Sequence, residues 1–242
     1  MDMKQEVDKD EIRKMAEQVT KLCNNLTCKY DVNELSCNVL AGLPKNGVYV
    51  IFDKTQRDFG LPRIVRVGTH TGKDNLPNRI KNHFLSEDKD SSIFRKNVGL
   101  ALLEKDGSTD NLFKKQWKTD FKDANKHKYW KNPDFNYGFE YLEKKVSLEK
   151  RVTDYMKENL SFAVIEITGE DFEEIKKCCL KLEEKLIATL SLDNKLNQTL
   201  FPNWLGNFSP ENKIKESGLW LVQKLYKNPF QSENELNILK GR

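Results

Sequence analysis

Two stretches of the sequence decide the fold: Gly47-Val48-Tyr49-Val50-Ile51-Phe52 and Arg63-Ile64-Val65-Arg66-Val67-Gly68. Each is a short run rich in β-branched or aromatic residues, a composition typical of a strand. The residues between them, 53–62, are mostly polar and include a glycine and a proline. This pattern predicts an antiparallel hairpin whose strands are joined by an exposed loop.

The segments after the hairpin predict three helices and one more strand. Pro77 suits the first turn of a helix, where a missing N–H costs little, and Ser92 can cap the start of another. The expected elements are helices over about 76–85, 93–104 and 171–190 and a strand over 161–168. We therefore expect an α/β (α+β) fold in which helices flank a small, mainly antiparallel, three-stranded sheet.

The chain divides into a core and additions at three places. Residues 1–40 carry apolar residues at helical spacing in a charged background, which predicts an N-terminal helical extension. Residues 41–190 hold the core, with an insertion rich in lysine and aromatic residues at about 106–160. Residues 191–242 include tryptophans next to turn residues, and we expect this C-terminal extension to pack on the core.

The composition excludes a membrane protein and favours the cytoplasm. None of the 242 residues lies in an apolar run near the roughly 18 residues that a spanning helix needs. The N-terminus lacks the apolar region of a signal peptide, so we expect a cytoplasmic location. Five cysteines without a CxxC pair are expected to stay reduced and to bind no zinc. The net charge of +4 is too small to identify a partner by itself.

The basic charge is concentrated in one segment. Residues 113–131 contain seven lysines, two acidic residues and five aromatic residues. One interpretation is a nucleic-acid surface, in which lysines contact phosphates and aromatic rings stack or pack. The other is an amphipathic helix with Phe113, Trp117 and Phe121 packed inward and solvated lysines outside. The sequence favours neither. The lysines assigned to a nucleic-acid surface are Lys114, Lys115, Lys118, Lys122, Lys126 and Lys128.

Glu183 lies in the middle of the apolar stripe on a helical wheel of residues 172–190, and the other acidic residues lie outside that stripe. An unpaired carboxylate that faces a core is strongly unfavourable or takes up a proton. Glu183 therefore requires a cation, either a basic side chain or a metal ion. Lys176, two turns back, is too distant to be that partner. A structural ion pair and a functional carboxylate remain equally open.

Three other residues could carry chemistry, but each has an ordinary structural explanation. Arg79 and His83 are four residues apart, so they are neighbours on one helix surface. Each could be a solvated charge beside the core. Tyr49 lies on the opposite face of its strand from Val48 and Val50, as expected for a core tyrosine with a satisfied hydroxyl.

Taken in order, these residues resemble the motifs of the GIY-YIG nuclease superfamily. Gly47-Val48-Tyr49 is similar to the GIY element, and Arg66-Val67-Gly68 is similar to the YIG element. Residues 75–84 are similar to the family's helix with the pattern N-L-x-x-R-x-x-x-H/Y-F, and residues 182–187 are similar to its L-E-x-x-L-I segment. The resemblance covers residues 44–104 and 161–190.

The resemblance implies a metal-dependent endonuclease that hydrolyses phosphodiester bonds of double-stranded DNA, with a role in restriction or defence. Glu183 would hold Mg2+, or Mn2+ in its place. Arg79 would donate to the nonbridging phosphate oxygens. Tyr49 would act as the general base on the attacking water, and His83 would polarise Tyr49 or shuttle its proton. Whether the protein is a homodimer is left open.

Two positions depart from the family's pattern. Arg66 stands where a tyrosine usually opens the YIG element, and an arginine cannot act as a base at neutral pH. Arg66 would instead be a second phosphate ligand, and His70 would replace the basic residue that the family has after the YIG glycine. The missing tyrosine supports an alternative function, a catalytically inactive nucleic-acid-binding or interaction protein on the same fold.

Overall fold

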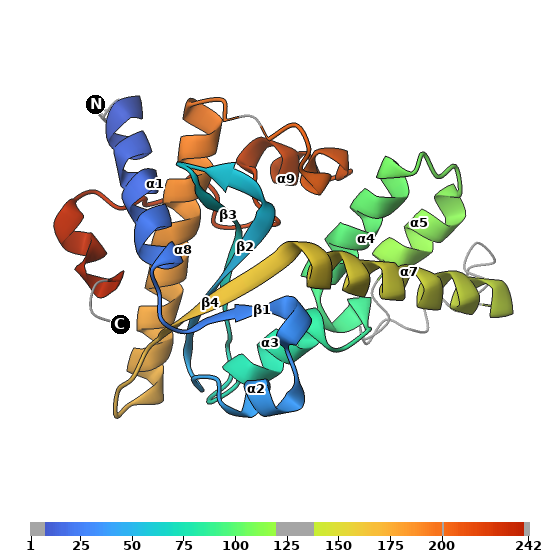
Figure 1. Ribbon diagram of the computed structural model, residues 1–242, viewed down its shortest axis with the longest axis horizontal. Helices are drawn as coiled ribbons and strands as arrows, with labels where there is room; N and C mark the ends of the chain where they lie inside the picture. The colour runs from blue at the N-terminus through green and yellow to red at the C-terminus, as the bar shows by residue number, and fades with distance from the viewer. Residues whose placement is uncertain (1–7, 120–137, 200, 240–242) are drawn as a thin grey trace.

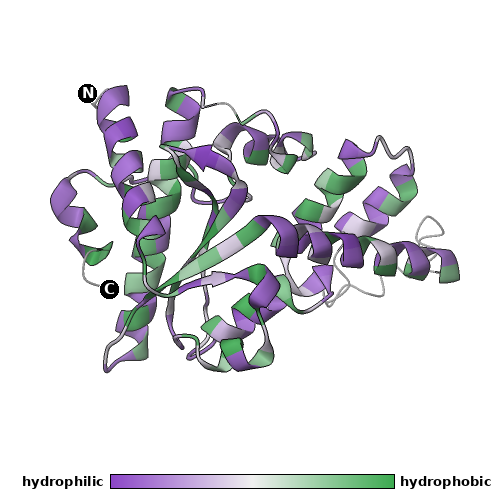
Figure 2. Ribbon diagram, in the orientation of Figure 1, coloured by the Kyte–Doolittle hydropathy of each residue, from purple (hydrophilic) through white to green (hydrophobic). Residues whose placement is uncertain are grey.

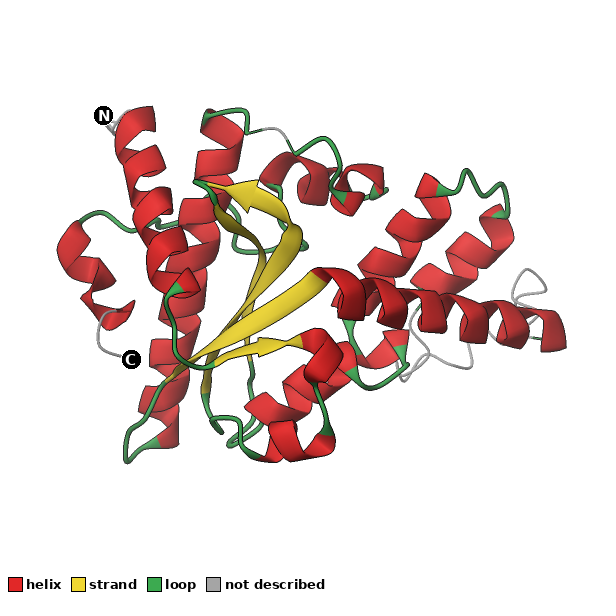
Figure 3. Cartoon of the chain, viewed as in Figure 1, coloured by secondary structure: helices red, strands yellow, loops and turns green. Residues whose placement is uncertain are grey.

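A computed structural model of the chain describes residues 8–119, 138–199 and 201–239 (Figure 1). At its centre lies one antiparallel sheet in the strand order β1-β4-β2-β3. The strands are β1 (Lys29–Asp31), β2 (Gly47–Asp58), β3 (Leu61–Thr69) and β4 (Leu160–Glu166). Figure 3 shows helices on both sides of this sheet. The α+β class and the three predicted strands are confirmed, but the sheet has a fourth strand, β1.

This fourth strand lies in the N-terminal segment that the sequence predicted to be helical. The segment does contain a helix, α1 (Lys9–Asn24), but the chain then turns into β1. β1 pairs with β4, where Tyr30 stacks on Phe162 with the ring centroids 5.1 Å apart. A strand of three residues is too short to show the alternation by which strands are recognised in a sequence.

The predicted helices are present with small shifts of their ends, and α8 continues further than expected. The helices after β1 are α2 (Cys37–Ala41), α3 (Leu76–Phe84), α4 (Ile93–Lys105), α5 (Asn111–Lys118), α7 (Phe139–Asn159), α8 (Phe172–Leu196) and α9 (Asn212–Ser217). Short 3-10 helices complete the described chain: η1 (Val32–Glu34), η2 (Lys89–Ser91), η3 (Leu205–Phe208) and η4 (Glu233–Leu239).

β2 and β3 form the predicted hairpin, but the exposed loop predicted over residues 53–62 is wrong. β2 continues to Asp58, and the chain turns at Phe59 and Gly60, which have φ of 53° and 76°. Two consecutive residues at positive φ suit a tight two-residue hairpin turn. Beyond Asp53 the side chains of β2 alternate in exposure, so polar residues occupy a strand whose outer end projects past the core.

The alternation of β2 side chains separates two hydrophobic clusters. Tyr49 and Ile51 belong to a cluster that also contains residues of α3, α4 and α7. Val48 and Val50 belong to a cluster that contains residues of α1 and α8. Figure 1 shows α1 and α8 side by side on one side of the sheet, and Figure 2 shows hydrophobic residues along the strands and along α8. The predicted orientation of Tyr49, opposite to Val48 and Val50, is confirmed.

The C-terminal residues close the free edge of β3. The backbone N–H of Trp220 donates to the carbonyl of Val65 at 2.7 Å. Trp204 and Trp220 belong to the cluster on the Tyr49 face, whereas Leu219 and Leu225 belong to the opposite cluster. The segment therefore passes around β3 from one face of the sheet to the other, and it covers an edge that would otherwise present unpaired backbone groups.

Candidate active site

Tyr49 and His83 form a buried hydrogen bond on one face of the sheet. The Tyr49 hydroxyl lies 2.8 Å from Nε2 of His83, and neither residue has exposed surface. Tyr49 pairs with Gly68 in the β2–β3 register, and a Cβ at Gly68 would overlap the hydroxyl and ring of Tyr49. Gly68 therefore has a physical role: only a residue without a side chain lets the Tyr49 ring cross β3 to reach His83.

The second ring nitrogen and the backbone carbonyl of His83 also have hydrogen-bond partners. Its Nδ1 lies 2.7 Å from Oγ of Ser92, and its backbone carbonyl accepts a hydrogen bond from Nη1 of Arg95 at 3.2 Å. Burial, followed by the positive charges of Arg66, Arg79 and Arg95, holds the pKa of His83 well below its usual 6.5. His83 is therefore neutral around pH 7, and each ring nitrogen has one fixed neighbour.

Arg79 supplies a partly exposed positive charge beside this pair. It lies one turn before His83 on α3, where Leu76, Ile80 and Phe84 are buried in the core. Among the residues that the structure describes, its guanidinium makes no hydrogen bond or ion pair. Its fork of donors is thus available to an anion that approaches α3.

Arg66 is buried and is already engaged. Its Nη1 donates to the carbonyl of Trp220, and its guanidinium carbon lies 5.0 Å from the centroid of the Phe94 ring. Its Nε has no hydrogen-bond partner within the described ranges, although the residue is only 4% exposed. The positive charge of Arg66 contributes to the lowered pKa of His83. Its guanidinium also binds the C-terminal segment through the carbonyl of Trp220.

Both ring nitrogens of His70 form hydrogen bonds with backbone groups of the chain. Its Nε2 accepts a hydrogen bond from the backbone N–H of Gly47 at 3.3 Å, and its Nδ1 donates to the carbonyl of Gly72 at 2.7 Å. With both ring nitrogens used and only 4% of the residue exposed, His70 holds the start of β2 in place. A phosphate would have to displace one of these bonds to reach His70.

Glu183 does have the cation that its position on the helical wheel required. It forms an ion pair with Nζ of Lys224, and its side chain is 13% exposed. The neighbouring Leu182 and Leu186 belong to the cluster on the opposite face of the sheet from Tyr49. Among the described residues, Glu183 makes no direct contact with Tyr49, Arg79 or His83.

A short piece of chain nevertheless connects the two groups. Trp220 accepts the hydrogen bond from Arg66, and Lys224, four residues later, pairs with Glu183. Four residues reach at most about 14 Å. The C-terminal segment therefore contacts Arg66 on one face of the sheet and Glu183 on the other, around the edge of β3.

Comparison with known protein families identifies the fold. The chain matches the family model described as the GIY-YIG domain over residues 7–240. The chain belongs to the GIY-YIG family. No curated protein and no solved structure matches it. In the parts of this GIY-YIG chain that the structure describes, no helix is long and apolar enough to cross a membrane.

The structure describes only three of the lysines that the sequence assigned to a nucleic-acid surface of this GIY-YIG chain: Lys114, Lys115 and Lys118. Phe113 and Trp117 of α5 are buried, as the amphipathic-helix interpretation predicted. Lys114 pairs with Glu104, and Lys118 pairs with Glu211 while its own side chain stays 62% exposed. Lys115 also lies on α5 and has interactions within the chain. The remaining assigned residues lie outside the described ranges: Phe121, Lys122, Lys126 and Lys128.

The family typically uses a divalent metal, and Glu183 is the carboxylate to which the motif resemblance assigns it. Within the described residues no group of three or more His, Cys, Asp or Glu side chains could enclose an ion. Mg2+, however, is usually held by one or two carboxylates together with waters and substrate phosphates. A single carboxylate that is 13% exposed suits that mode of binding, provided that Lys224 gives way.

Sequence reasoning missed three residues that contact the candidate site residues. Ser92 was assigned only as a helix cap, and it does accept from the N–H of Arg95 at 3.3 Å. Arg95 had no distinguishing pattern, because its burial and its contact with His83 arise only in the folded chain. Lys224 carried no local signal, because its contact with Glu183 spans 41 residues.

Proposed function

We propose that this GIY-YIG domain is a divalent-metal-dependent endonuclease that acts on double-stranded DNA. The observation that carries the proposal is the 2.8 Å bond between the Tyr49 hydroxyl and His83, set among the charges of Arg66, Arg79 and Arg95. Nearby cations and a hydrogen-bond donor stabilise the ionised form of a phenol. The same cations attract the phosphate that is to be cleaved.

Arg79 is the residue that we propose binds the scissile phosphate. A guanidinium donates two parallel hydrogen bonds to phosphate oxygens, and that of Arg79 has no competing partner among the described residues. Arg66 contributes its charge from a buried position. Lys118, whose side chain on α5 is 62% exposed, is a further proposed contact to the DNA backbone.

Tyr49 is the proposed general base for the attacking water. Its hydroxyl is buried beneath α3 and bonded to His83 in this structure, so the role requires a shift of α3 or of the Tyr49 side chain when DNA binds. A divalent metal bound at Glu183 would neutralise charge on the phosphate and stabilise the leaving oxygen. Lys224 must release Glu183 for that metal to bind.

The test is cleavage of supercoiled plasmid DNA with Mg2+ or Mn2+ by the wild type, Glu183→Gln and Arg79→Ala. Matched controls are Glu184→Gln, the adjacent carboxylate on α8, and Lys81→Ala, an exposed cation on α3. We expect cleavage by the wild type and both controls, and a loss of at least about a hundredfold in the two site variants. Full activity in Glu183→Gln or Arg79→Ala would refute the proposed site.

A second candidate is a nucleic-acid-binding protein on the same fold without catalysis. The observations that favour it are Arg66 in the position of the usual tyrosine and Lys224 in contact with the one candidate metal ligand. Binding of duplex DNA that depends on Arg79, with no cleavage of single- or double-stranded DNA in any divalent metal, would support this alternative over the endonuclease.

A further inference from the structure

We propose that Ser92 is a positioning residue that holds His83 in the tautomer with its proton on Nε2, so that His83 donates a hydrogen bond to the oxygen of Tyr49. The consequence for catalysis rests on the proposed endonuclease function. The tautomer itself follows from the hydrogen bonds that the described residues make around His83.

The first step is the hydrogen bonding of Ser92. Its Oγ accepts from the backbone N–H of Arg95 at 3.3 Å and lies 2.7 Å from Nδ1 of His83. A hydroxyl has one proton to donate, and a backbone N–H cannot receive it. Ser92 is 1% exposed, so water does not offer an acceptor. Among the described residues, the only acceptor for the Ser92 proton is Nδ1 of His83.

The second step concerns the ring of His83. A neutral imidazole carries one N–H, and a nitrogen that accepts a hydrogen bond is the one without the proton. His83 is neutral because it is buried among Arg66 of β3, Arg79 of α3 and Arg95 of α4. If Nδ1 accepts from Ser92, the proton is on Nε2 and points to the Tyr49 oxygen 2.8 Å away.

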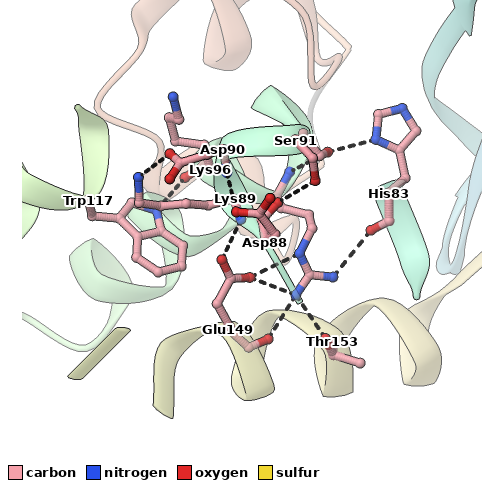
Figure 4. A network of polar contacts seen from close by, with 11 residues as sticks. His83, Asp88, Lys89, Asp90, Ser91, Lys96, Trp117, Glu149 and Thr153 are labelled. Carbon is pink, nitrogen blue, oxygen red and sulfur yellow. Dashed lines mark hydrogen bonds and ion pairs between the residues drawn. The ribbon is translucent and has the colours of Figure 1, made fainter. Parts of the chain in front are cut away.

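Ser92 is the N-cap of α4, and it bonds to the N–H of Arg95 beside a buried polar network (Figure 4). Arg95, three residues after Ser92, donates to the His83 carbonyl and is held by Oε2 of Glu149 at 2.8 Å and by Oγ1 of Thr153 at 2.8 Å. Figure 4 shows Glu149 and Thr153 reaching this network from α7, with His83 at its far end. The first turn of α4 therefore holds His83 at both its ring and its backbone.

This direction of hydrogen bonding changes the role of His83. A ring that donates to the Tyr49 oxygen cannot accept the Tyr49 proton through the same nitrogen. It would stabilise the ionised tyrosine instead, and His83 would not carry the Tyr49 proton. Of the two roles that the sequence suggested for His83, polarising Tyr49 is the one that this geometry supports.

The decisive experiment is a two-bond proton–nitrogen NMR spectrum of the full chain labelled with nitrogen-15 at histidine. The chain has three histidines, and His83→Gln assigns the signal of interest. His70 is an internal reference of opposite type, because its Nε2 accepts from Gly47 and its Nδ1 donates to Gly72. We expect His83 to show a protonated Nε2 and an unprotonated Nδ1. A protonated Nδ1 on His83 would overturn the inference.

Two variants of Ser92 separate its proton from its capping role. Ser92→Asp keeps an acceptor for the Arg95 N–H but has no proton to give, so we expect His83 to change to the Nδ1–H tautomer. Ser92→Thr keeps the hydroxyl and should keep the wild-type spectrum. An unchanged His83 signal in Ser92→Asp would contradict the proposed role. If Ser92→Asp does not fold, the wild-type and Ser92→Thr spectra still decide.

Kinetics then connects the tautomer to the reaction. We expect Ser92→Asp to lower kcat by at least about tenfold with little change in KM, because it removes donation to Tyr49. Ser92→Thr should stay within about twofold of the wild type. Absence of cleavage by the wild type would count against the proposed function only, since the tautomer is read from the spectrum.

Discussion

Lys224 and Glu183 form an ion pair that joins the C-terminal segment to α8. Lys224 adopts a left-handed backbone conformation with φ of 60°, and the nearby Tyr226 and Asn228 also have positive φ. Residues other than glycine adopt this conformation at an energetic cost and persist in it where surrounding contacts hold them. The Lys224 ammonium contacts the Glu183 carboxylate, where a divalent metal is proposed to bind.

Replacement of Lys224 by methionine is expected to increase the affinity for Mn2+. A metal that binds Glu183 in the wild type must displace the ammonium, and in Lys224→Met it need not. We expect the Kd for Mn2+ to fall by about tenfold, which corresponds to about 1.4 kcal/mol. Isothermal titration calorimetry or Mn2+ electron paramagnetic resonance measures this change.

The matched control for that substitution is Lys227→Met, which removes an exposed lysine from the same segment. Its Mn2+ affinity should equal that of the wild type. Equal affinities in all three proteins would show that Lys224 does not compete with the metal. Combining Lys224→Met with Glu183→Gln should abolish the gain.

Gly68→Ala is expected to disrupt the Tyr49–His83 pair. A Cβ at this position would overlap the Tyr49 hydroxyl and ring, so the buried ring would have to move away from its bond to His83. Overpacking of this kind costs about 1 to 3 kcal/mol of stability. Urea unfolding should show that loss, and the His83 signals should shift in the nitrogen-15 spectrum.

Gly42→Ala provides the comparison. Gly42 has φ of −86°, and the nearest atom to an added Cβ lies at 3.6 Å. The unfolding free energy of this variant should stay within about 0.5 kcal/mol of the wild type. A Gly68→Ala protein as stable as Gly42→Ala, with an unchanged His83 spectrum, would show that Tyr49 does not need the glycine.

Glu149→Gln is expected to lower the free energy of unfolding by about 3 to 5 kcal/mol, because it leaves the charge of Arg95 buried and unpaired. The side chains of Arg95 and Glu149 are 0% and 3% exposed, and their closest atoms are 2.8 Å apart. Glu140→Gln, on the same helix, removes an 82% exposed carboxylate and should cost less than about 0.5 kcal/mol. Similar urea midpoints for the two variants would argue against a structural role for the buried pair.

Local patterns in the sequence predicted the elements that carry the candidate site. The alternation in β2 placed Tyr49 opposite Val48 and Val50, and the helical wheel of α8 showed that Glu183 needed a cation. Both inferences depend on periods of two or 3.6 residues, which a single segment contains in full. For the same reason, α3 and α4 were found with nearly correct ends, whereas α8 continues past the predicted residue 190 to Leu196 and α7 was not predicted.

Contacts between distant parts of the chain could not be predicted in this way. The partner of Glu183 is a lysine 41 residues later, and Trp220 reaches Val65 across 155 positions of sequence. β1 was missed because three residues show no period, and its strand exists through pairing with β4. Such contacts are selected by the assembled fold, where an edge must be covered and a buried charge must be paired.

Asp193 gives this protein a pH dependence of stability that opposes the usual behaviour of a paired carboxylate. Its side chain is 2% exposed and accepts a hydrogen bond from Nη1 of Arg13 at 2.6 Å. Burial raises the pKa of Asp193 to about 6, and it outweighs the lowering effect of Arg13. Between about pH 4 and pH 6 the folded protein therefore binds a proton that the unfolded chain does not.

The contribution of Asp193 to the free energy of unfolding should thus fall as the pH rises through this window, by roughly 2 kcal/mol after allowance for the 34% exposure of its partner Arg13. Asp193→Asn removes the titration. Urea unfolding at pH 4.5 and pH 7.5 should show that the wild type loses stability relative to Asp193→Asn at the higher pH. Asp58→Asn, which removes the other carboxylate bound to Arg13, should keep most of the effect. A difference between wild type and Asp193→Asn that stays constant, or grows in favour of the wild type with rising pH, would show that Arg13 dominates over burial.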